Sequence, residues 1–512
     1  MQGHKEFKPR LFYTLSLERL VPEDHELRRF AAVLRLDWLR GATADLYSHT
    51  GQPSVDPVVL IKMMLLTVLY NVRSERQLAK DMAVNLAYRW FLGYDLDEET
   101  PNHSVLSKAR RRFGEGLFVE LFSRVVEQCR EAGLVDGSGL YVDSTLVRAD
   151  ASTKSIVPVE EIARSRWEHL EATAEGEEWQ RGKRGPAPKD PSGPQQVGKH
   201  FDGRVDMERI GQRRRNRRRS NARRRSKTDP DATTHTRPGS FFGLSYRVHQ
   251  GISRDGVITA VAVTDSATHD GSQVPRLLEQ HREHAGKPER VTGDSHYGSI
   301  DVLAYLQEQG IETCIPPYKV RNRSGFFSLD DFGYDREKDE YICPEGARLG
   351  RSRQSTPKGR IAYRASVSDC RGCGSRDRCI ATKRADATRY LSFYAGGYVE
   401  RAKELCGSAE GEQELKFRHT VLEGMFGTQK CRHGLGRARY RRLWRVSIQA
   451  HVTATVMNLK KLAQAAAVRA GSVPPTGRRG PELAADFASF LVEKVSRILM
   501  FPLPSATAPL PS

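Results

Sequence analysis

The sequence predicts an α/β protein in which helices flank a mixed sheet and an all-helical region precedes that sheet. Two observations support this prediction. Residues 136–315 read as three strands, followed by a helix, a strand, a second helix and a last strand. Residues 1–135 read only as helices. A chain of 512 residues is long enough to bury a core in each of these regions.

The helical region, residues 1–135, contains recognisable start and stop signals. In SVDPVVLIKMMLLTVLYNV, Ser54 and Asp56 are candidate caps, and Pro57 occupies a favoured first helical position. Apolar residues continue at helical spacing in SERQLAKDMAVNLAYRWFLG, where Gly93 predicts a helix end. The segment TPNHSVLSKARRRF predicts a basic helix. We expect this region either to bind DNA or to serve in packing and dimerisation.

The sheet-forming region, residues 136–460, begins with a strand in LYVDSTLVRADAS, where apolar and polar residues alternate. The strands SFFGLSYRVHQGIS and GVITAVAVTDSATHD are joined by a turn around Asp255 and Gly256. A helix in VPRLLEQHREHAG, a strand in PERVTGDSHYGS, a helix in IDVLAYLQEQG and a strand in IETCIPP follow. Helical patterns return in LKFRHTVLEGMFGTQKCRHG and SIQAHVTATVMNLKKLAQAAA.

Two segments interrupt this region, and a tail follows it. Residues 151–237 are polar and very basic, which predicts an exposed insertion or a mobile arm. Residues 318–405 predict a loop-rich insertion that contains cysteines. Residues 461–512, with PPTGRRGPE and PLPSATAPLPS, predict a partly disordered C-terminal tail.

The charge of the chain indicates a polyanionic partner. Lys and Arg number 82 against 63 Asp and Glu, which gives a net charge of +19. Residues 213–227 hold ten of these positive charges and no acid, yet the remainder still carries +9. Nucleic acid is therefore a better candidate partner than a membrane surface.

Apolar runs and the cysteine count predict the cellular compartment of the protein. The most apolar run, Val58 to Tyr70, spans thirteen residues and includes Lys62, so it is too short to cross a bilayer. The N-terminal MQGHKEFKPRLFYTLSLERL lacks the apolar core of a signal peptide. Eight cysteines in 512 residues do not suggest a disulfide framework. We expect a cytoplasmic protein that associates with the nucleoid when bound to DNA, and no membrane partner.

Three acids lie where they are suited to catalysis. Asp143 lies within the first strand, in YVDST; Asp294 ends a later strand, in VTGDSHYG; Glu423 lies on a helix, in HTVLEGMFGTQK. Sheets with parallel strands place sites beyond strand ends, so the two aspartates can converge there while the helix supplies Glu423. Carboxylates suit Mg²⁺ or Mn²⁺, and two such ions promote phosphodiester chemistry. Considered alone, each acid is equally typical of a residue that caps a turn or a helix and has no catalytic role.

These three blocks, in this order, resemble those of DDE-type insertion-sequence transposases, and most closely the group numbered eleven-eighty-two. The N-terminal GQPSVDPVVLIKMMLLTVLYNVRSERQLAKDMAVNLAYRWFLG and TPNHSVLSKARRRF resemble the N-terminal domain of that group. The resemblance runs over most of residues 10–460. It implies a ribonuclease-H-like core, two divalent ions held by Asp143, Asp294 and Glu423, double-stranded DNA as the partner, and a homodimer on DNA.

The third block also predicts DNA contacts. Glu423 and Lys430 are seven residues apart, so they share one helix face, and Lys430 is expected to contact a phosphate. By the resemblance, they match the Glu and Lys of the family's Tyr–Arg–Glu–Lys signature. His419 stands at the Arg position of that signature, with Arg418 beside it, and Lys416 at the Tyr position. The basic residues that follow are expected to contact the DNA backbone, namely Arg437, Arg439, Arg441 and Arg442.

The basic run is a second predicted DNA contact. Its arginines would neutralise phosphates and give salt-sensitive, sequence-tolerant affinity. The alternatives are a patch that resembles a nuclear-localisation signal and a loop that only increases solubility. The residues concerned are Arg213, Arg214, Arg215, Arg217, Arg218 and Arg219, within a run that continues to Arg225.

Four cysteines of the second insertion meet the count for a structural Zn²⁺ site. They stand in ICPEG and CRGCGSRDRC as Cys343, Cys370, Cys373 and Cys379. Their spacing is irregular, so reduced thiols without a metal and a redox pair are the alternatives.

Together these features predict an enzyme that cuts the ends of a mobile element with the help of divalent metal ions and joins them to target DNA. A nuclease of the same fold and a catalytically inactive DNA-binding relic are the two alternatives. A nuclease would cut the ends without joining them, so joining of cut ends excludes the nuclease. Any metal-dependent cleavage excludes the inactive relic.

Overall fold

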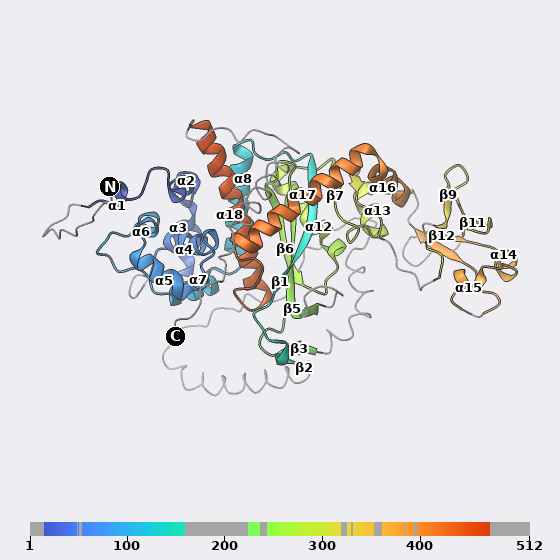
Figure 1. The fold of residues 1–512 in the computed structure, drawn as a ribbon, viewed down its shortest axis with the longest axis horizontal. Helices are drawn as coiled ribbons and strands as arrows, with labels where there is room; N and C mark the ends of the chain where they lie inside the picture. The colour runs from blue at the N-terminus through green and yellow to red at the C-terminus, as the bar shows by residue number, and fades with distance from the viewer. Residues whose placement is uncertain are drawn as a thin grey trace, which may run out of the picture.

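The computed structural model describes residues 15–48, 50, 54–158, 224–235, 243–318, 325–328, 331–352, 361–382, 384–393 and 397–471. A helical N-terminal region, a central sheet with its helices, and a second sheet follow one another along the long axis of the molecule (Figure 1). This order matches the order of the segments in the sequence analysis.

The N-terminal region is helical, as predicted. Asp56 caps its longest apolar helix by accepting a hydrogen bond from the Val58 amide, and Pro57 is the first residue of that helix. Gly93 ends a helix in the left-handed conformation. The predicted stretch 74–93 is two helices, because the Asn85 side chain caps a new start. The helices are α1 (Leu17–Leu20), α2 (Glu26–Val33), α3 (Trp38–Thr43), η1 (Ala44–Leu46), α4 (Pro57–Leu69), α5 (Glu75–Val84), α6 (Leu86–Leu92), α7 (Ser104–Phe113) and α8 (Gly116–Glu131).

The basic helix α7 is less available to DNA than its sequence suggests. Arg110 is buried, its guanidinium is 2.5 Å from Glu75, and it stacks over the ring of Tyr440. Arg112 lies over the ring of Tyr47. These two arginines therefore take part in packing within the protein.

The last helix, α18 (Leu443–Arg469), joins the N-terminal region to the sheet. Ile448, Val452 and Val456 belong to the core of the N-terminal helices, whereas Val446 and Ala450 belong to the core on one face of the sheet. The helix continues to Arg469, beyond the predicted start of the tail at residue 461. Residues 472–512 lie outside the described residues.

The central sheet contains both antiparallel and parallel pairs. Its strand order is β4–β5–β1–β7–β8, and β6 also pairs with β5. β1 runs antiparallel to β5 and parallel to β7, and β7 runs parallel to β8. The strands are β1 (Gly139–Arg148), β4 (Thr233–His235), β5 (Gly243–Ile252), β6 (Ile258–Asp265), β7 (Arg290–Thr292) and β8 (Glu312–Cys314).

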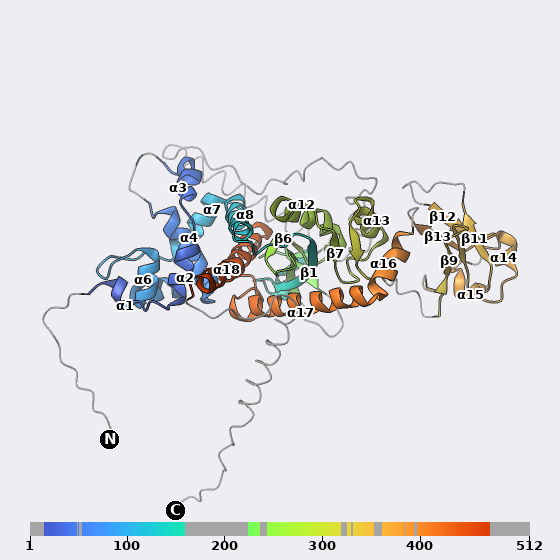
Figure 2. The same cartoon turned by 90° about the horizontal axis from the view of Figure 1, so that it is seen from above.

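Alternate residues of β1 face opposite sides of this sheet, and this alternation places the candidate acids. Leu140 and Val142 pack in the same core as α12 (Val274–Ala285) and α13 (Ile300–Glu308). Tyr141 and Val147 pack on the other side, in the core that contains residues of α17 (Ala409–Arg432) and α18. Figure 2 shows α12 and α13 on one side of the sheet and α17 on the other. The period of two places Asp143 on the α17 side.

Residues 318–405, which the sequence predicted as a loop-rich insertion, contain a second sheet. Its five strands pair antiparallel in the order β13–β12–β11–β10–β9. Strands of three or four residues are too short to show a clear alternation, so the sequence pattern does not reveal them. The elements are β9 (Gly333–Asp335), β10 (Glu340–Ile342), β11 (Arg348–Arg351), β12 (Ile361–Arg364), α14 (Val367–Arg371), α15 (Arg376–Cys379), β13 (Tyr390–Phe393) and α16 (Tyr398–Gly407).

The basic insertion is described only at its two ends, where β2 (Ile156–Pro158) pairs antiparallel with β3 (Arg224–Ser226). η2 (Thr153–Ser155) precedes β2. The predicted DNA contacts from Arg213 to Arg219 lie outside the described residues. Among the described helices, none has the length and apolar character needed to cross a bilayer.

Candidate active site

Two of the three predicted acids meet where the short strand β7 ends beside β1. Asp143 stands in the middle of β1, and Asp294 follows the end of the parallel strand β7. One oxygen of each carboxylate is held by a nearby backbone amide. Ser144 N–H donates to Asp143 Oδ1 at 2.7 Å, and His296 N–H donates to Asp294 Oδ1 at 2.9 Å. Each side chain is therefore anchored to the backbone of its own segment.

The second oxygen of each carboxylate faces Arg418 on α17. The guanidinium Nη2 lies 2.9 Å from Asp143 Oδ2 and 4.0 Å from Asp294 Oδ2. Arg418 Nε also donates to the Val142 carbonyl at 3.1 Å. Only 9% of the Arg418 side chain is exposed, so this predicted DNA contact instead lies inside the protein, between the two acids.

The environments of the two aspartates shift their pKa values in opposite directions. Burial raises the pKa of Asp143, and the charges of Asp294 and Asp270 add to that effect, while Arg418 opposes it. Burial also acts to raise the pKa of Asp294, but the hydrogen bond from His296 and the charge of Arg418 outweigh it. The pKa of Asp294 therefore lies below its ordinary value, and that of Asp143 lies above it.

A fourth acid, Asp270, lies behind Ser144 and was not among the predicted site residues. It begins η3 (Asp270–Gln273) and is buried. Ser144 Oγ donates to Asp270 Oδ1 at 2.9 Å, and Arg247 Nη1 donates to the same oxygen at 2.6 Å. Burial lowers the pKa of the neighbouring His249 to about 3, so Arg247 is the charge that balances Asp270. No local motif marks this pair, because its members come together only through the sheet.

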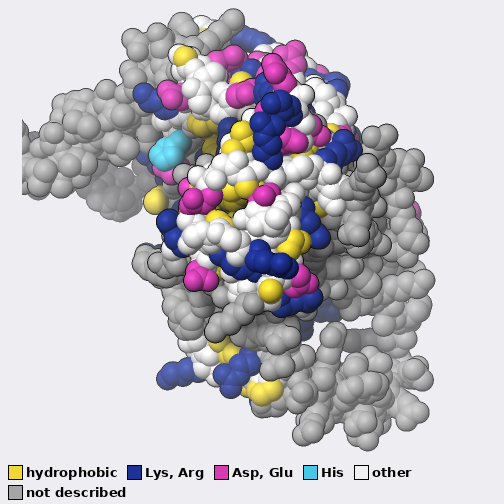
Figure 3. Space-filling view, turned by 90° about the vertical axis from the view of Figure 1, so that its right-hand side faces the viewer, with side chains coloured by type: hydrophobic (Ala, Val, Ile, Leu, Met, Phe, Trp, Pro, Cys, Tyr) yellow, Lys and Arg dark blue, Asp and Glu magenta, His cyan; other side chains and the backbone are white. Residues whose placement is uncertain are grey.

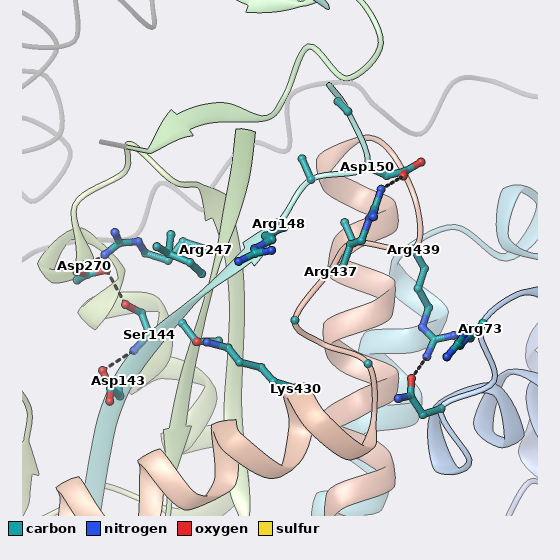
Figure 4. Close-up of a pocket in the computed structure, with 18 of the residues that line it drawn as sticks. Arg73, Asp143, Ser144, Arg148, Asp150, Arg247, Asp270, Lys430, Arg437 and Arg439 are labelled. Atoms are coloured by element: carbon teal, nitrogen blue, oxygen red, sulfur yellow. Dashed lines mark hydrogen bonds and ion pairs between the residues drawn. The ribbon is translucent and has the colours of Figure 1, made fainter. Parts of the chain in front are cut away.

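A cavity of about 1250 Å³ opens beside the two candidate acids. It extends along β1 from Asp143 to Arg148 and reaches the segment after α4, where Arg73 borders it. Lys430 projects from α17 toward β1 within this cavity (Figure 4). Burial lowers the pKa of Lys430, and the charge of Asp143 opposes that shift. The predicted phosphate contact Lys430 thus lines the cavity together with Asp143.

Glu423 lies on the same helix but outside this cavity. Its side chain is 64% exposed, and His419 Nε2 lies 3.2 Å from Glu423 Oε1. Five residues separate Glu423 from Arg418, which turns it by about 140° around the helix, whereas Lys430 is nearly in line with it. The structure therefore brings Asp143 and Asp294 together and holds Glu423 on the exposed face of α17.

The arginines that follow α17 differ in their availability. Arg437 is 71% exposed and lies 3.0 Å from Asp150 Oδ1. Arg439 is largely enclosed, because it donates to the Val72 carbonyl and, at 2.9 Å, to Asn71 Oδ1. Arg441 donates to the Asp150 carbonyl at 3.0 Å. Arg437 lines the cavity with an exposed side chain, whereas Arg439 mainly ties the segment to the N-terminal region.

The four cysteines of the second insertion also line one cavity, of about 290 Å³. Cys343 follows β10, and its sulfur accepts a hydrogen bond from the Ala347 amide at 3.2 Å. Cys370 is on α14, Cys379 ends α15, and Cys373 lies between these helices. Burial raises the pKa of Cys379, and the three other thiols add to that effect.

The donor chemistry at the two aspartates fits a hard divalent cation, although the set is incomplete as placed. Their Oδ2 atoms point at a single positive group, which is the arrangement that a bridging cation requires. Among the described residues, however, no three His, Cys, Asp or Glu side chains stand close enough to hold an ion. Asp143 and Asp294 are thus two suitable ligands without a third.

Paired carboxylates beside a cavity lined by Arg and Lys are the features of an enzyme that acts on phosphodiesters. Two family models match the chain and narrow this class. The Transposase domain (DUF772) matches residues 15–112, and the Transposase DDE domain matches residues 342–463. Searches of curated proteins and of solved structures found no match.

The protein is a DNA transposase with a DDE domain, and hence an enzyme of the polynucleotidyl-transferase or nuclease type. DNA is its partner, and its family depends in general on divalent metal ions. The second match contains Glu423, Lys430 and the four cysteines, whereas Asp143 and Asp294 lie before it.

Proposed function

We propose that Asp143, Asp294 and Glu423 are the catalytic acids of this transposase and that they hold two Mg²⁺ or Mn²⁺ ions. The observation that carries this proposal is the convergence of Asp143 and Asp294 on one cationic position between β1 and β7. Glu423 is the third ligand because it lies on the helix that crosses this position and shares the face of Lys430. Its carboxylate contacts only the exposed His419 among the pairs described, so it is available to move.

The proposed reaction proceeds in two in-line substitutions. Water attacks the phosphodiester at the element end and frees a 3′-hydroxyl, which then attacks a phosphodiester of the target. Bound ions of this kind activate the attacking oxygen and stabilise the leaving one. Lys430 holds a phosphate beside Asp143, and Ser144 fixes the strand between Asp143 and the Asp270–Arg247 pair.

The path of the DNA follows from the lining of the large cavity. Arg148 and Arg437 border it at the far end of β1, and Arg73 borders it from the N-terminal region. Basic side chains at spaced positions bind the phosphate backbone without reading sequence. At the end of the molecule formed by the second sheet, in contrast, Lys and Arg are interspersed with Asp and Glu (Figure 3). We propose that DNA lies along the cavity and that the basic run from Arg213 to Arg219 grasps it.

The remaining proposals concern fold, group and assembly. In the central sheet β1, β5 and β6 pair antiparallel in turn, and β7 and β8 extend the sheet from β1 in parallel, which supports a ribonuclease-H-like core. We assign the protein to the insertion-sequence group numbered eleven-eighty-two, because the sequence blocks around Asp143, Asp294 and Glu423 resemble those of that group. A homodimer on DNA, and a cytoplasmic enzyme that associates with the nucleoid through its DNA, complete the proposal.

The test uses the purified full-length protein, DNA carrying candidate element ends, Mg²⁺ and a target plasmid. We expect cleavage at the ends and covalent joining to the plasmid, both dependent on the divalent ion. Cleavage without joining favours a nuclease, and binding without cleavage contradicts the proposed catalytic site.

We also propose that Cys343, Cys370, Cys373 and Cys379 hold one structural Zn²⁺. Four thiols line one cavity of the second sheet, and a backbone amide donates to the Cys343 sulfur, which orients this proposed ligand. Arg376 and Arg389 also line the cavity. Burial raises the pKa of Cys379 overall, and the charge of Arg389 partly opposes that shift. Binding of the ion would draw the four thiols together, because among the described residues they do not form a closed donor set.

A further inference from the structure

The position of Arg418 raises a question that the proposed function leaves open. Its Nη2 lies 2.9 Å from one proposed metal ligand and 4.0 Å from the other. A cation that bridges two carboxylates sits at about 2.1 Å from each oxygen when it is Mg²⁺. The guanidinium and a bridging ion would therefore occupy the same space.

The other oxygen of each carboxylate is already engaged by the backbone. Asp143 Oδ1 accepts the Ser144 amide, and Asp294 Oδ1 accepts the His296 amide. His296 Nδ1 also lies 3.2 Å from Asp294 Oδ2. The two Oδ2 atoms, which accept from side chains and both face Arg418, are thus the oxygens that a shared ion would meet with the least rearrangement of the backbone.

Arg418 is held in this place by a backbone hydrogen bond and borders a free space. Its Nε donates to the Val142 carbonyl, and its side chain is 9% exposed. A second cavity, of about 450 Å³, is lined by Arg418 together with Asp294, Tyr318 and His419. That cavity gives the guanidinium a space to enter when it leaves the acids.

We propose that Arg418 is an internal counterion that holds Asp143 and Asp294 together before metal binds and that a divalent ion must displace it. This inference rests on the proposed function, because it assumes that these two aspartates bind the ion. Two carboxylates this close repel each other unless a positive charge lies between them. Arg418 supplies that charge in the metal-free protein and thereby keeps the site assembled while lowering its affinity for metal.

The chain offers a matched control in Arg247. It also forms a buried ion pair, with 9% of its side chain and 5% of the Asp270 side chain exposed. It lines the same large cavity, but it contacts Asp270 and not the proposed metal ligands. Loss of Arg247 thus reports the general effect of removing one positive charge and one buried pair.

The experiment measures Mn²⁺ binding to the full-length, metal-free protein by titration calorimetry, without DNA. We expect Arg418→Gln to bind Mn²⁺ at least roughly tenfold more tightly than the unmodified protein, because a repelling charge has gone. Arg247→Gln should change the affinity much less. In thermal melts without metal, Arg418→Gln should be less stable, and Mn²⁺ should restore more stability to it than to the unmodified protein.

Equal or weaker Mn²⁺ binding by Arg418→Gln would overturn the inference, and so would an equal gain in Arg247→Gln. If Arg418→Gln does not fold, Arg418→Lys keeps the charge but loses the forked contact, and it should bind Mn²⁺ more tightly than the unmodified protein. Asp143→Asn separates the two proposals. Unchanged Mn²⁺ binding in that variant contradicts the proposed function itself, whereas lost binding leaves the Arg418 comparison to decide the inference.

Discussion

The backbones of Arg148 and Arg437 run side by side and join the end of β1 to the segment after α17. The Arg148 amide donates to the Gly436 carbonyl at 3.2 Å, and the Ala438 amide donates to the Arg148 carbonyl at 2.7 Å. Arg418 ties the same helix to β1 at Val142. Because Glu423 lies between these two attachments, the backbone of the third proposed acid is fixed relative to Asp143.

The first prediction concerns the two aspartates. Asp143→Asn or Asp294→Asn should abolish DNA cleavage, because an amide keeps the shape of the side chain but loses the charge that holds the ions. Binding to the element ends should remain largely intact, because the basic side chains of the cavity are unchanged. Cleavage assays and gel-shift titrations of each variant measure both properties. Near-normal cleavage by either variant would refute the site assignment.

The second prediction concerns Glu423. Glu423→Gln should reduce cleavage by a factor of about one hundred or more, whereas Glu412→Gln on the same helix should leave it unchanged. Both side chains are exposed, and the contact of Glu423 with His419 is a surface pair worth at most about 0.5 kcal/mol. Melting temperatures of the two variants should therefore match that of the unmodified protein. Full activity of Glu423→Gln would mean that another acid, such as Asp270, completes the site.

Local sequence signals predicted the elements well because the signals act over a few residues. Asp56 and Gly93 cap helices where expected, and the alternation in YVDST places Asp143 on one face of β1. The sequence also contained a signal for Arg418 that the family pattern obscured. Arg418 lies four residues before Leu422 and eight before Phe426, on the apolar stripe of α17. That spacing indicates a buried guanidinium.

Other features depend on contacts between distant segments, so no local pattern reveals them. The Arg247–Asp270 pair joins a strand to a turn across the sheet. Arg110 and Tyr440 are far apart in the chain, and their contact removes part of the predicted basic face of α7. The strands of the second sheet are too short for periodicity to distinguish them from loops.

The third prediction concerns the basic run, which lies outside the described residues. Changing Arg213, Arg214, Arg215, Arg217, Arg218 and Arg219 to Gln should weaken DNA binding about equally for all sequences. Each lost phosphate contact lowers the slope of log K against log salt by about 0.9, so the slope should fall by up to roughly 5. Filter-binding titrations at several salt concentrations measure this slope.

The control for the basic run removes arginines that already pair with acids on the second sheet. Arg336, Arg348 and Arg384 are exposed and contact Glu404, Glu340 and Asp386. Their change to Gln should leave the salt slope unaltered. A slope that stays constant when the basic run is neutralised would show that the run does not contact DNA.

The fourth prediction concerns stability in acid. Burial lowers the pKa of His281 to about 4 and that of His451 to about 4. Between the ordinary value of about 6.5 and these values, the unfolded chain binds more protons than the native one. The free energy of unfolding is therefore fully retained above pH 6.5 and falls as the pH drops toward 4, by up to about 3 kcal/mol for each histidine.

Urea unfolding at a series of pH values measures this loss. His281→Gln should reduce the slope of unfolding free energy against pH by about one proton between pH 6.5 and 4.5. The imidazole of His281 lies between Thr259 Oγ1, at 2.7 Å, and the Gly137 carbonyl, at 3.3 Å, so Gln retains hydrogen-bonding capacity there. An identical slope in this variant would show that His281 binds a proton in the native state.

The fifth prediction is that the second sheet holds one zinc ion. Cys343, Cys370, Cys373 and Cys379 border one cavity, and the strands around them are only three or four residues long. Metal binding would supply folding free energy that such short strands lack. The sheet leads through α16 into α17, which carries Arg418 and Glu423, so its order affects the proposed catalytic site.

Elemental analysis of protein purified without chelators decides this last prediction, and about one zinc per chain is the expected result. Cys373→Ser should lower the zinc content and the melting temperature, and the same change at Cys129 should not lower the zinc content. Cys129 provides the matched comparison because it is buried against α18, where its thiol faces the Asn458 carbonyl at 3.8 Å. Far less than one zinc per chain, together with a mild effect of Cys373→Ser, would mean that the four thiols only pack in the apolar core.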